Sequence, residues 1–142
     1  MASSLPTMTV VAGLIAHDGQ LLICQRRRDA AFAYKWEFPG GKIEPGETPE
    51  AGLQRELHEE LGITAQLGPE MYRTRHDYPG KFSVELVFYA VAAYSGTLHN
   101  YAFEQIRWAT PEHLPSFDFL DGDAELITLL SQGKLGLPQS QA

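Results

Sequence analysis

The fold is decided by residues 41–63, which read GKIEPGETPEAGLQRELHEELGI. Thr48 is suited to cap the start of a helix, because its hydroxyl can accept a backbone N–H, and Pro49 fits the first turn. Gly62 is placed to end that helix. An apolar stripe that can pack on a core recurs at every fourth residue, at Leu53, Leu57 and Leu61. The segment therefore predicts one amphipathic helix between Thr48 and Gly62.

Three glutamates of this helix share one face, namely Glu56, Glu59 and Glu60. At about 100° per residue, their spacing of i, i+3 and i+4 places them within one quadrant. Like charges at these spacings repel one another and weaken a helix, so a cation is expected above them. Hard divalent cations such as Mg²⁺ take oxygen ligands and bridge to substrate phosphates. The alternative is an acidic face that meets only solvent, the commoner meaning of an isolated Glu-Glu pair.

Residues around the helix favour the metal site over a solvated face. Gly40 and Gly41 allow a close approach of the backbone, and the carbonyl of Gly40 can itself face a metal. Glu47 precedes the helix, and the five-donor fork of Arg55 can reach back to hold it. Gly52 lies near the acidic stripe one turn earlier, where the missing side chain is expected to leave room for a ligand.

The remainder of the chain alternates short apolar runs with turns. Asp18-Gly19 is a strong tight-turn signal, so the first two strands are expected to form a hairpin. Strands are expected at residues 10–15, 21–24, 36–38, 71–76, 83–90 and 103–109, and a terminal helix at 124–130. This order predicts an α+β fold, an α/β/α sandwich in which two helices cover a mixed, mainly antiparallel sheet. The length fits a single domain over residues 1–142, with frayed ends at 1–7 and 134–142.

Composition narrows the class of protein and its partners. Hydrophobic residues make up 44% and charged residues 20% of the chain, and no apolar run approaches a membrane span. The net charge of −7 argues against polymeric nucleic acid as a partner, but a metal and a few local cations can still bind phosphates. A single cysteine, Cys24, and the lack of a secretory signal suit the cytoplasm. Both a monomer and a homodimer remain open.

Residues 41–63 resemble the Nudix box. That pattern runs Gly, five residues, Glu, seven residues, Arg-Glu, an aliphatic residue, one residue, Glu-Glu, one residue, Gly and an aliphatic residue. The matching positions are Gly41, Glu47, Arg55, Glu56, Leu57, Glu59, Glu60, Gly62 and Ile63. The flanking residues 36–44, WEFPGGKIE, are similar to the MutT subgroup, and the resemblance covers roughly residues 8–132. It implies the Nudix fold.

The resemblance also implies roles for the residues of the box. In the family, divalent ions are bound at the places of the Gly40 carbonyl, Glu56, Glu59 and Glu60. Glu56 or Glu59 helps to deprotonate the attacking water, and Arg55 orients the carboxylates. Structural roles within the box fall to Gly41, Glu47 and Gly62, with Glu47 also a candidate for a secondary metal contact.

The reaction implied is Mg²⁺-dependent hydrolysis, with Mn²⁺ able to replace Mg²⁺, of a nucleoside triphosphate to a nucleoside monophosphate and pyrophosphate. MutT-like members attack the inner, β phosphorus. The substrates expected are 8-oxo-dGTP, CTP or a modified dCTP, and the role is sanitation of the nucleotide pool. One alternative is hydrolysis of a dinucleoside polyphosphate or nucleotide sugar, and another is a non-catalytic module that senses a nucleotide.

A fourth acidic ligand is expected near the end of the sheet. In MutT-like proteins a glutamate lies shortly before the strand that ends in Trp, here Trp108. The place six residues before Trp108 holds Ala102, a departure from the family pattern. Glu104 is the nearest acid and is expected to replace the missing ligand, unless it is only an exposed strand charge.

Substrate contacts are expected from five further residues, each with a structural alternative. Arg26 and Lys42 match places that meet phosphate or sugar, or they are solvated surface cations. Phe38 and Tyr78 match places where the family packs the base, or they fill the core and a turn. Asp123 aligns with the residue that reads the edge of the base, and its alternative is the N-cap of the terminal helix.

Overall fold

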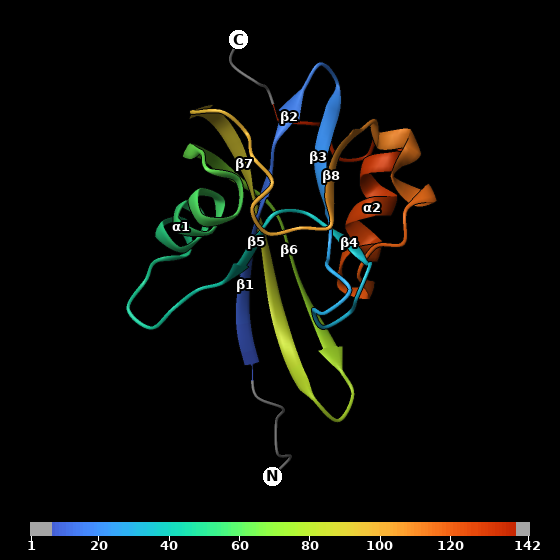
Figure 1. The fold of residues 1–142 in the computed structure, drawn as a ribbon. Coiled ribbons are helices and arrows are strands. Elements are labelled where there is room, and N and C mark those ends of the chain that lie inside the picture. The colour runs from blue at the N-terminus through green and yellow to red at the C-terminus, as the bar shows by residue number, and fades with distance from the viewer. Residues whose placement is uncertain (1–6, 139–142) are drawn as a thin grey trace.

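The computed structural model of the 142-residue chain describes residues 7–138. Helix α1 (Pro49–Leu61) lies on one side of the strands and helix α2 (Ala124–Ser131) lies on the other side (Figure 1). Two 3₁₀ segments, η1 (Pro111–Ser116) and η2 (Asp121–Asp123), lead into α2. The α+β sandwich predicted from the sequence is therefore confirmed.

The strands form two sheets, where a single sheet was expected. The first is mixed, with the order β5 (Gly40–Lys42), β1 (Thr7–Leu14), β7 (Phe82–Ser95) and β6 (Thr64–Tyr78). Only the pair β1 and β7 is parallel. The second is antiparallel and is centred on β3, with strands β2 (Ala16–His17), β3 (Gln20–Gln25), β4 (Trp36–Glu37) and β8 (Gln105–Ala109). The chain changes sheet between β1 and β2, just before the expected hairpin turn at Asp18-Gly19.

Helix α1 begins and ends where the sequence predicts. The hydroxyl of Thr48 accepts a hydrogen bond from the backbone N–H of Ala51 at 3.1 Å. Gly62 has a φ of 73°, and its N–H donates to the carbonyl of His58. Because glycine adopts this left-handed conformation without a steric penalty, it closes the helix at this point.

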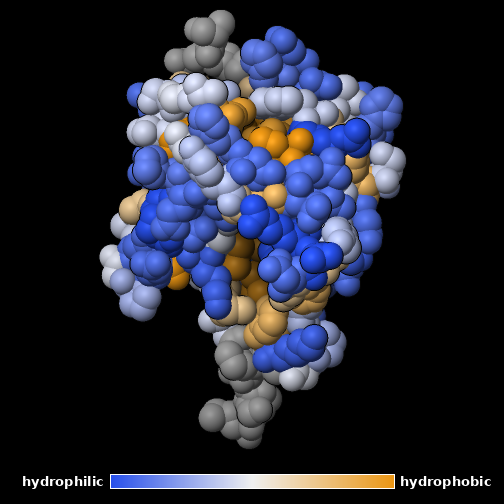
Figure 2. All heavy atoms as spheres, viewed as in Figure 1, coloured by the Kyte–Doolittle hydropathy of each residue, from blue (hydrophilic) through white to orange (hydrophobic). Residues whose placement is uncertain are grey.

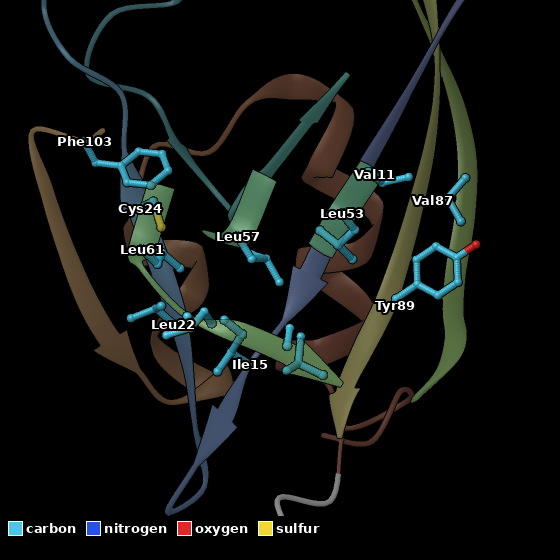
Figure 3. Packing of buried hydrophobic residues seen from close by; sticks show 13 residues of the cluster. Val11, Ile15, Leu22, Cys24, Leu53, Leu57, Leu61, Val87, Tyr89 and Phe103 are labelled. Atoms are coloured by element: carbon cyan, nitrogen blue, oxygen red, sulfur yellow. The ribbon is translucent and has the colours of Figure 1, made fainter. Parts of the chain in front are cut away.

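Two apolar clusters form the core, one beneath each helix. The three leucines of α1 are fully buried against Val11, Ile15 and neighbouring side chains (Figure 3). Burying each leucine contributes about 1.5–3 kcal/mol relative to leaving it exposed. Strand β7 serves both clusters, because Val87 and Phe88 point to opposite faces, as its alternating pattern predicts. The helix that carries the glutamates is thereby fixed against the mixed sheet.

Strand β6 is longer than expected and begins at Thr64. Its register against β7 shifts three times between Gln66 and Tyr72. These irregularities interrupt the two-residue alternation by which a strand is recognised in a sequence. The sequence therefore indicated only the regular second half of the strand.

The expected frayed ends are only partly covered by the described residues, since 1–6 and 139–142 lie outside them. Thr7 pairs with Ser83 at the start of β1. Leu135 and Leu137 pack against the apolar cluster beneath α2. Within residues 7–138, no helix has the length and apolar character needed to cross a membrane.

Candidate active site

A cavity of about 560 Å³ opens between the mixed sheet, helix α1 and the segment before α2. Apolar side chains cover its wall along the strands, among them Val10, Val84, Leu86 and Phe88. Figure 2 shows apolar surface at the bottom of a hollow that hydrophilic side chains border. The cavity thus combines an apolar interior with a polar rim, which is typical of a small-molecule site.

Helix α1 presents two of its three stacked glutamates to the cavity. Glu56 and Glu60 line it, whereas the side chain of Glu59 is 57% exposed and lies outside the lining. The backbone N–H of Gly40 donates to Oε1 of Glu60 at 3.1 Å. Strand β5 therefore lies against the acidic face of the helix and brings the Gly40 backbone to the carboxylates.

Arg55 holds the acidic groups in place from behind. Its Nε and Nη2 donate to the two carboxylate oxygens of Glu47 at 2.7 and 3.0 Å. Its Nη1 donates to Glu56 at 2.8 Å and to Glu59 at 3.3 Å. Hydrogen bonds from Arg55 and from the Glu44 N–H lower the pKa of Glu47 to about 2. The reach of Arg55 to Glu47, proposed from the sequence, is present in the structure.

The two cavity glutamates share one nearby cation, Arg55, which contacts Glu56 and is also bonded to Glu47. Burial, together with the charges of Glu56 and Glu37, raises the pKa of Glu60 to about 9. Burial also raises the pKa of Glu56, although hydrogen bonding to Arg55 opposes the shift. A divalent cation would relieve this repulsion, and carboxylate oxygens are the ligands that Mg²⁺ prefers. The donor set therefore fits Mg²⁺.

The carboxylates do not form a closed metal cage on their own. In residues 7–138, no group of three or more His, Cys, Asp or Glu side chains is arranged to hold a metal ion. Arg55 occupies Oε1 of Glu56, and Glu59 lies at the exposed rim. Mg²⁺ commonly binds through one or two carboxylates, with waters and substrate phosphates completing its shell. An open pair of glutamates suits that mode of binding.

Two glycines keep the backbone close to the acids. Gly40 has a φ of 154°, and a Cβ there would lie 1.9 Å from the carbonyl oxygen of Val11. A Cβ on Gly41 would lie 2.6 Å from Oε2 of Glu56. Neither position can carry a side chain without moving the strand or the carboxylate. The close approach expected of this glycine pair is what the structure shows.

Gly52 has a different purpose from the one expected. A Cβ at this position would lie 2.8 Å from Cγ2 of Ile43 and 3.1 Å from Oε1 of Glu47. Protein atoms already fill this space, so it leaves no room for a ligand. The expectation was wrong, because Gly52 permits close packing of the loop before α1 onto the helix.

Arg26 and Glu37 form an ion pair in the wall of the cavity. Nη1 of Arg26 lies 3.1 Å from Oε2 of Glu37, and both residues line the cavity. Burial raises the pKa of Glu37, and the charge of Arg26 opposes the shift. Arg27 and Arg28 are exposed, so Arg26 is the one member of the arginine run that faces the cavity.

Sequence reasoning missed Glu37, although a signal was present. An acid between two large aromatic residues, Trp36 and Phe38, is unusual in a short apolar strand. Such an acid needs a partner, and the antiparallel pairing of Cys24 with Glu37 places Arg26 nearby. The pairing of β3 with β4 could not be read from the sequence with enough certainty to name this ion pair.

The aromatic residues expected at the base end lie at different depths. Phe38 is 3% exposed and packs on Phe88 and Phe119, so it lines the cavity from the core. Tyr78 lies at the mouth, where its ring is 5.2 Å from that of Phe32. Sequence reasoning also missed Phe32, which lies in an irregular loop without periodicity.

Asp123 faces the cavity and does not cap α2. It stands at the N-cap place but makes no capping hydrogen bond with its side chain. It is 4% exposed, whereas the other acids of the cavity, Glu37, Glu56 and Glu60, are partly buried. Burial, together with the charge of Glu37, raises the pKa of Asp123 to about 8. The position favours ligand contact over the capping alternative.

The structure does not bring every candidate to the cavity. Lys42 lines it from β5. Glu104 is exposed and lies outside the lining, and its backbone N–H donates to the carbonyl of Gln25 as the chain enters β8. Glu47 and Arg55 stand behind the lining, and Gly62 ends the helix away from it. The candidates that share the cavity are Arg26, Phe38, Gly40, Gly41, Lys42, Glu56, Glu60, Tyr78 and Asp123.

The sequence of the chain is similar to a known protein family and to enzymes of known activity. The NUDIX domain family matches residues 6–130. The chain is 35% identical over 118 residues to a CTP pyrophosphohydrolase of Escherichia coli, covering 83% of this chain and 87% of the relative. It is 39% identical over 120 residues to an 8-oxo-dGTP diphosphatase of Haemophilus influenzae, again covering 83% and 87%.

Solved structures agree with this likeness. The solution structure of the Escherichia coli ORF135 protein matches with a TM-score of 0.80 at 32% identity, covering 92% of each chain. The crystal structure of the MutT protein from Methanosarcina mazei Go1 matches with a TM-score of 0.82 at 21% identity, covering 94% of this chain and 99% of the other. The second likeness concerns the fold alone.

Proposed function

The chain belongs to the Nudix family and is a MutT-like hydrolase, and from this premise we propose that it splits a nucleoside triphosphate into a nucleoside monophosphate and pyrophosphate. One observation carries the proposal. A single cavity has the acids Glu56 and Glu60 in one wall and a buried acid, Asp123, among apolar and aromatic side chains in another. The first group suits a polyphosphate with its cation, and the second suits a base.

We propose Mg²⁺, which Mn²⁺ can replace, as the ion held by Glu56 and Glu60. The Gly40 carbonyl contributes from β5, and Glu59 contributes from the rim. When bound, the ion lowers the pKa of a water and neutralises charge on phosphate oxygens. Arg55 keeps Glu56 and Glu59 oriented, and one of these two accepts the proton of the attacking water. Glu104 is a weaker candidate for a further ligand, because its side chain is exposed outside the cavity.

Lys42 and Arg26 are the cations that we assign to the substrate. Both line the cavity, Lys42 from β5 beside the glycine pair and Arg26 from the end of β3. The charge of Arg26 is already paired with Glu37, so it can donate further hydrogen bonds without leaving an uncompensated charge. We therefore assign Lys42 to the phosphates and Arg26 to the sugar or the nearest phosphate.

Asp123 is the residue that we assign to the edge of the base, with Phe38 and Tyr78 packing against it. Because the pKa of Asp123 is raised to about 8, its carboxyl group is protonated at neutral pH and offers both a donor and an acceptor. Cytosine and guanine each present an adjacent donor and acceptor. The carboxyl group thus fixes the base without choosing between CTP, a modified dCTP and 8-oxo-dGTP, our candidate substrates.

The proposed role is sanitation of the nucleotide pool in the cytoplasm. A net charge of −7 suits free nucleotides better than nucleic-acid polymers, because wide nonspecific binding to a phosphate backbone relies on net positive charge. We propose that a single domain carries the activity, as a monomer or a homodimer.

The test is a panel of substrates hydrolysed with Mg²⁺. It contains CTP, 8-oxo-dGTP, a modified dCTP, a dinucleoside polyphosphate and a nucleotide sugar. We expect pyrophosphate rather than phosphate from a triphosphate and, in ¹⁸O water, label in the pyrophosphate, since attack at the β phosphorus adds the water oxygen there. Turnover of the dinucleoside polyphosphate far above every triphosphate would instead establish the alternative substrate class.

A matched pair of variants connects the activity to the cavity. Glu56→Gln removes a cavity carboxylate, whereas Glu50→Gln makes the same change at an exposed place on the same helix. We expect turnover to be lost in the first variant and kept in the second. Equal turnover in the two variants would show that this acid does not take part.

A further inference from the structure

The loop between β3 and β4 holds two aromatic residues in a rare backbone conformation. Phe32 has a φ of 55° and Tyr34 a φ of 64°, and neither is glycine. Bulky residues adopt the left-handed region only where their surroundings impose it. The loop is tied by hydrogen bonds from Nε of Arg26 to the carbonyl of Ala31 and from the N–H of Tyr34 to the carbonyl of Arg26. Its shape is therefore set by its own contacts.

The two aromatic rings of this loop meet different surroundings. Phe32 lines the cavity, its ring lies 5.2 Å from that of Tyr78, and Nζ of Lys81 lies 5.9 Å from its centroid. Tyr34 is 49% exposed and does not line the cavity. Phe32 thus connects the loop across the mouth of the cavity to the turn between β6 and β7.

Phe32 is also incompletely buried, at 37% exposure. A large apolar ring at the mouth of a cavity gains from being covered by an apolar surface. The adjoining wall is apolar as well, with Phe82, Val84 and Leu86, and polar groups reach the cavity from Asp123 and from the Arg26–Glu37 ion pair. A flat heterocycle with hydrogen-bonding edges suits this mixture better than a phosphate chain does.

We propose that Phe32 is a specificity-determining residue that covers the base of the bound nucleotide and closes the cavity together with Tyr78. This inference rests on the proposed function, since it assigns a residue to the base end of that site. The contact strengthens binding of the nucleotide and does not affect the chemical step, which takes place at the glutamates of α1. A purine presents more ring area to Phe32 than a pyrimidine does and therefore depends on it more.

The size of the effect follows from aromatic contacts with bases. Removing one such contact typically weakens binding by about tenfold. We therefore expect Phe32→Ala to raise KM by about tenfold for a purine triphosphate, and by less for a pyrimidine triphosphate, with kcat nearly unchanged. The dissociation constant of the corresponding nucleoside monophosphate, measured by calorimetry without metal, should rise by the same factor.

Tyr34→Ala is the matched control, because it removes an aromatic ring from the same loop and the same backbone conformation without touching the cavity. Its KM and monophosphate affinity should remain at wild-type values. Phe32→Leu keeps apolar cover without an aromatic face and should lie between wild type and Phe32→Ala. Melting temperatures identify a variant that fails to fold, in which case Phe32→Leu carries the comparison.

Three results would overturn the assignment. If the wild type hydrolyses nucleotides and Phe32→Ala cannot be distinguished from Tyr34→Ala, Phe32 does not cover the base, while the proposed function stands. A fall in kcat with KM unchanged would likewise contradict a binding role. A wild type that neither hydrolyses nor binds any nucleotide would refute the proposed function and this assignment together.

Discussion

The two ends of the cavity are built in different ways. At the carboxylate end, one helix supplies both cavity acids, Glu56 and Glu60, together with the arginine that braces them. At the base end the residues come from four segments, namely Arg26 and Phe32 from the β3–β4 loop, Glu37 from β4, Tyr78 from β6 and Asp123 before α2. The first end depends on helical spacing, whereas the second depends on how the sheets and loops meet.

The two ends also tolerate buried acids by different means. Glu56 and Glu60 lie close together, and Arg55, which donates to Glu56, is shared with Glu47. At the base end, Glu37 is neutralised by Arg26, and Asp123 is kept protonated by burial. One end therefore calls for an external cation and the other does not. We expect metal dependence to follow substitutions at the first end and pH dependence to follow those at the second.

The largest effect is expected from Glu60→Gln at the carboxylate end. Losing a charged ligand removes several kcal/mol of charge stabilisation in the transition state, so turnover with Mg²⁺ should fall by about 10³. The amide oxygen of glutamine can still accept the hydrogen bond from the N–H of Gly40, so the melting temperature should not fall. Steady-state kinetics and a thermal melt check both parts. Turnover within a few-fold of wild type would show that the metal is held elsewhere.

Arg55→Lys should have the next largest effect. The guanidinium donates twice to Glu47 and also to Glu56, and the single ammonium of lysine cannot reproduce that fork. Loss of a group that orients metal ligands typically costs 10–100-fold, which we expect in the Mg²⁺ concentration needed for half-maximal activity. A titration of activity against Mg²⁺ measures this shift.

Glu47→Gln tests whether Arg55 acts through its neighbours. Because the two side chains form one unit, the double variant Arg55→Lys with Glu47→Gln should lose less activity than the product of the two single losses. Fully multiplicative losses would mean that Arg55 works independently of Glu47.

The carboxylate end is also where the sequence was most informative. Thr48 and Gly62 set the two ends of α1, and the leucine repeat sets which side of the helix packs on the sheet. That orientation turns Glu56 and Glu60 toward the cavity. All of these signals lie within a single helix, so their geometry follows from residue spacing alone. The outward position of Glu59 could not be predicted in this way, because it depends on where β5 crosses the acidic face.

The base end illustrates the limit of the same reasoning. Asp123 could cap α2 or face the cavity, and only the packing before that helix decides between them. Glu37 and Phe32 gain their positions from the pairing of β3 with β4 and from a loop with two left-handed residues. The irregular half of β6 was missed for a related reason, since bulges remove the alternation that marks a strand.

Asp123→Asn tests the contrast between the two ends through the pH dependence of folding stability. The carboxyl pKa in the folded protein, about 8, lies above the ordinary value of 3.8. Its contribution to folding is therefore complete below about pH 4 and is lost as the pH rises through 8. Asparagine does not ionise, so the variant should lack this slope and exceed the wild type in stability by a few kcal/mol near pH 8, in the absence of ligand. Urea unfolding between pH 4 and pH 9 measures the difference.

The same variant predicts a change in substrate binding. Above pH 8 the wild-type carboxyl group loses its donor, whereas asparagine keeps a donor and an acceptor at every pH. The wild-type KM should therefore rise by about tenfold between pH 7 and pH 9 relative to that of the variant. Parallel KM profiles in the two proteins would show that Asp123 does not contact the base.

Glu104→Gln should have the smallest effect, and it tests whether the carboxylate end includes any acid outside helix α1. The side chain of Glu104 is exposed and lies outside the cavity. The backbone N–H of the same residue donates a hydrogen bond to the carbonyl of Gln25. Substituting an exposed acid that orients no other group should change turnover and the Mg²⁺ requirement by less than about twofold. A loss comparable with that of Glu60→Gln would mean that the segment before β8 moves to the cavity when substrate binds. The carboxylate end would then also include a residue from a segment far from α1 in the sequence. Its dependence on helical spacing would differ less from the way in which the base end is built.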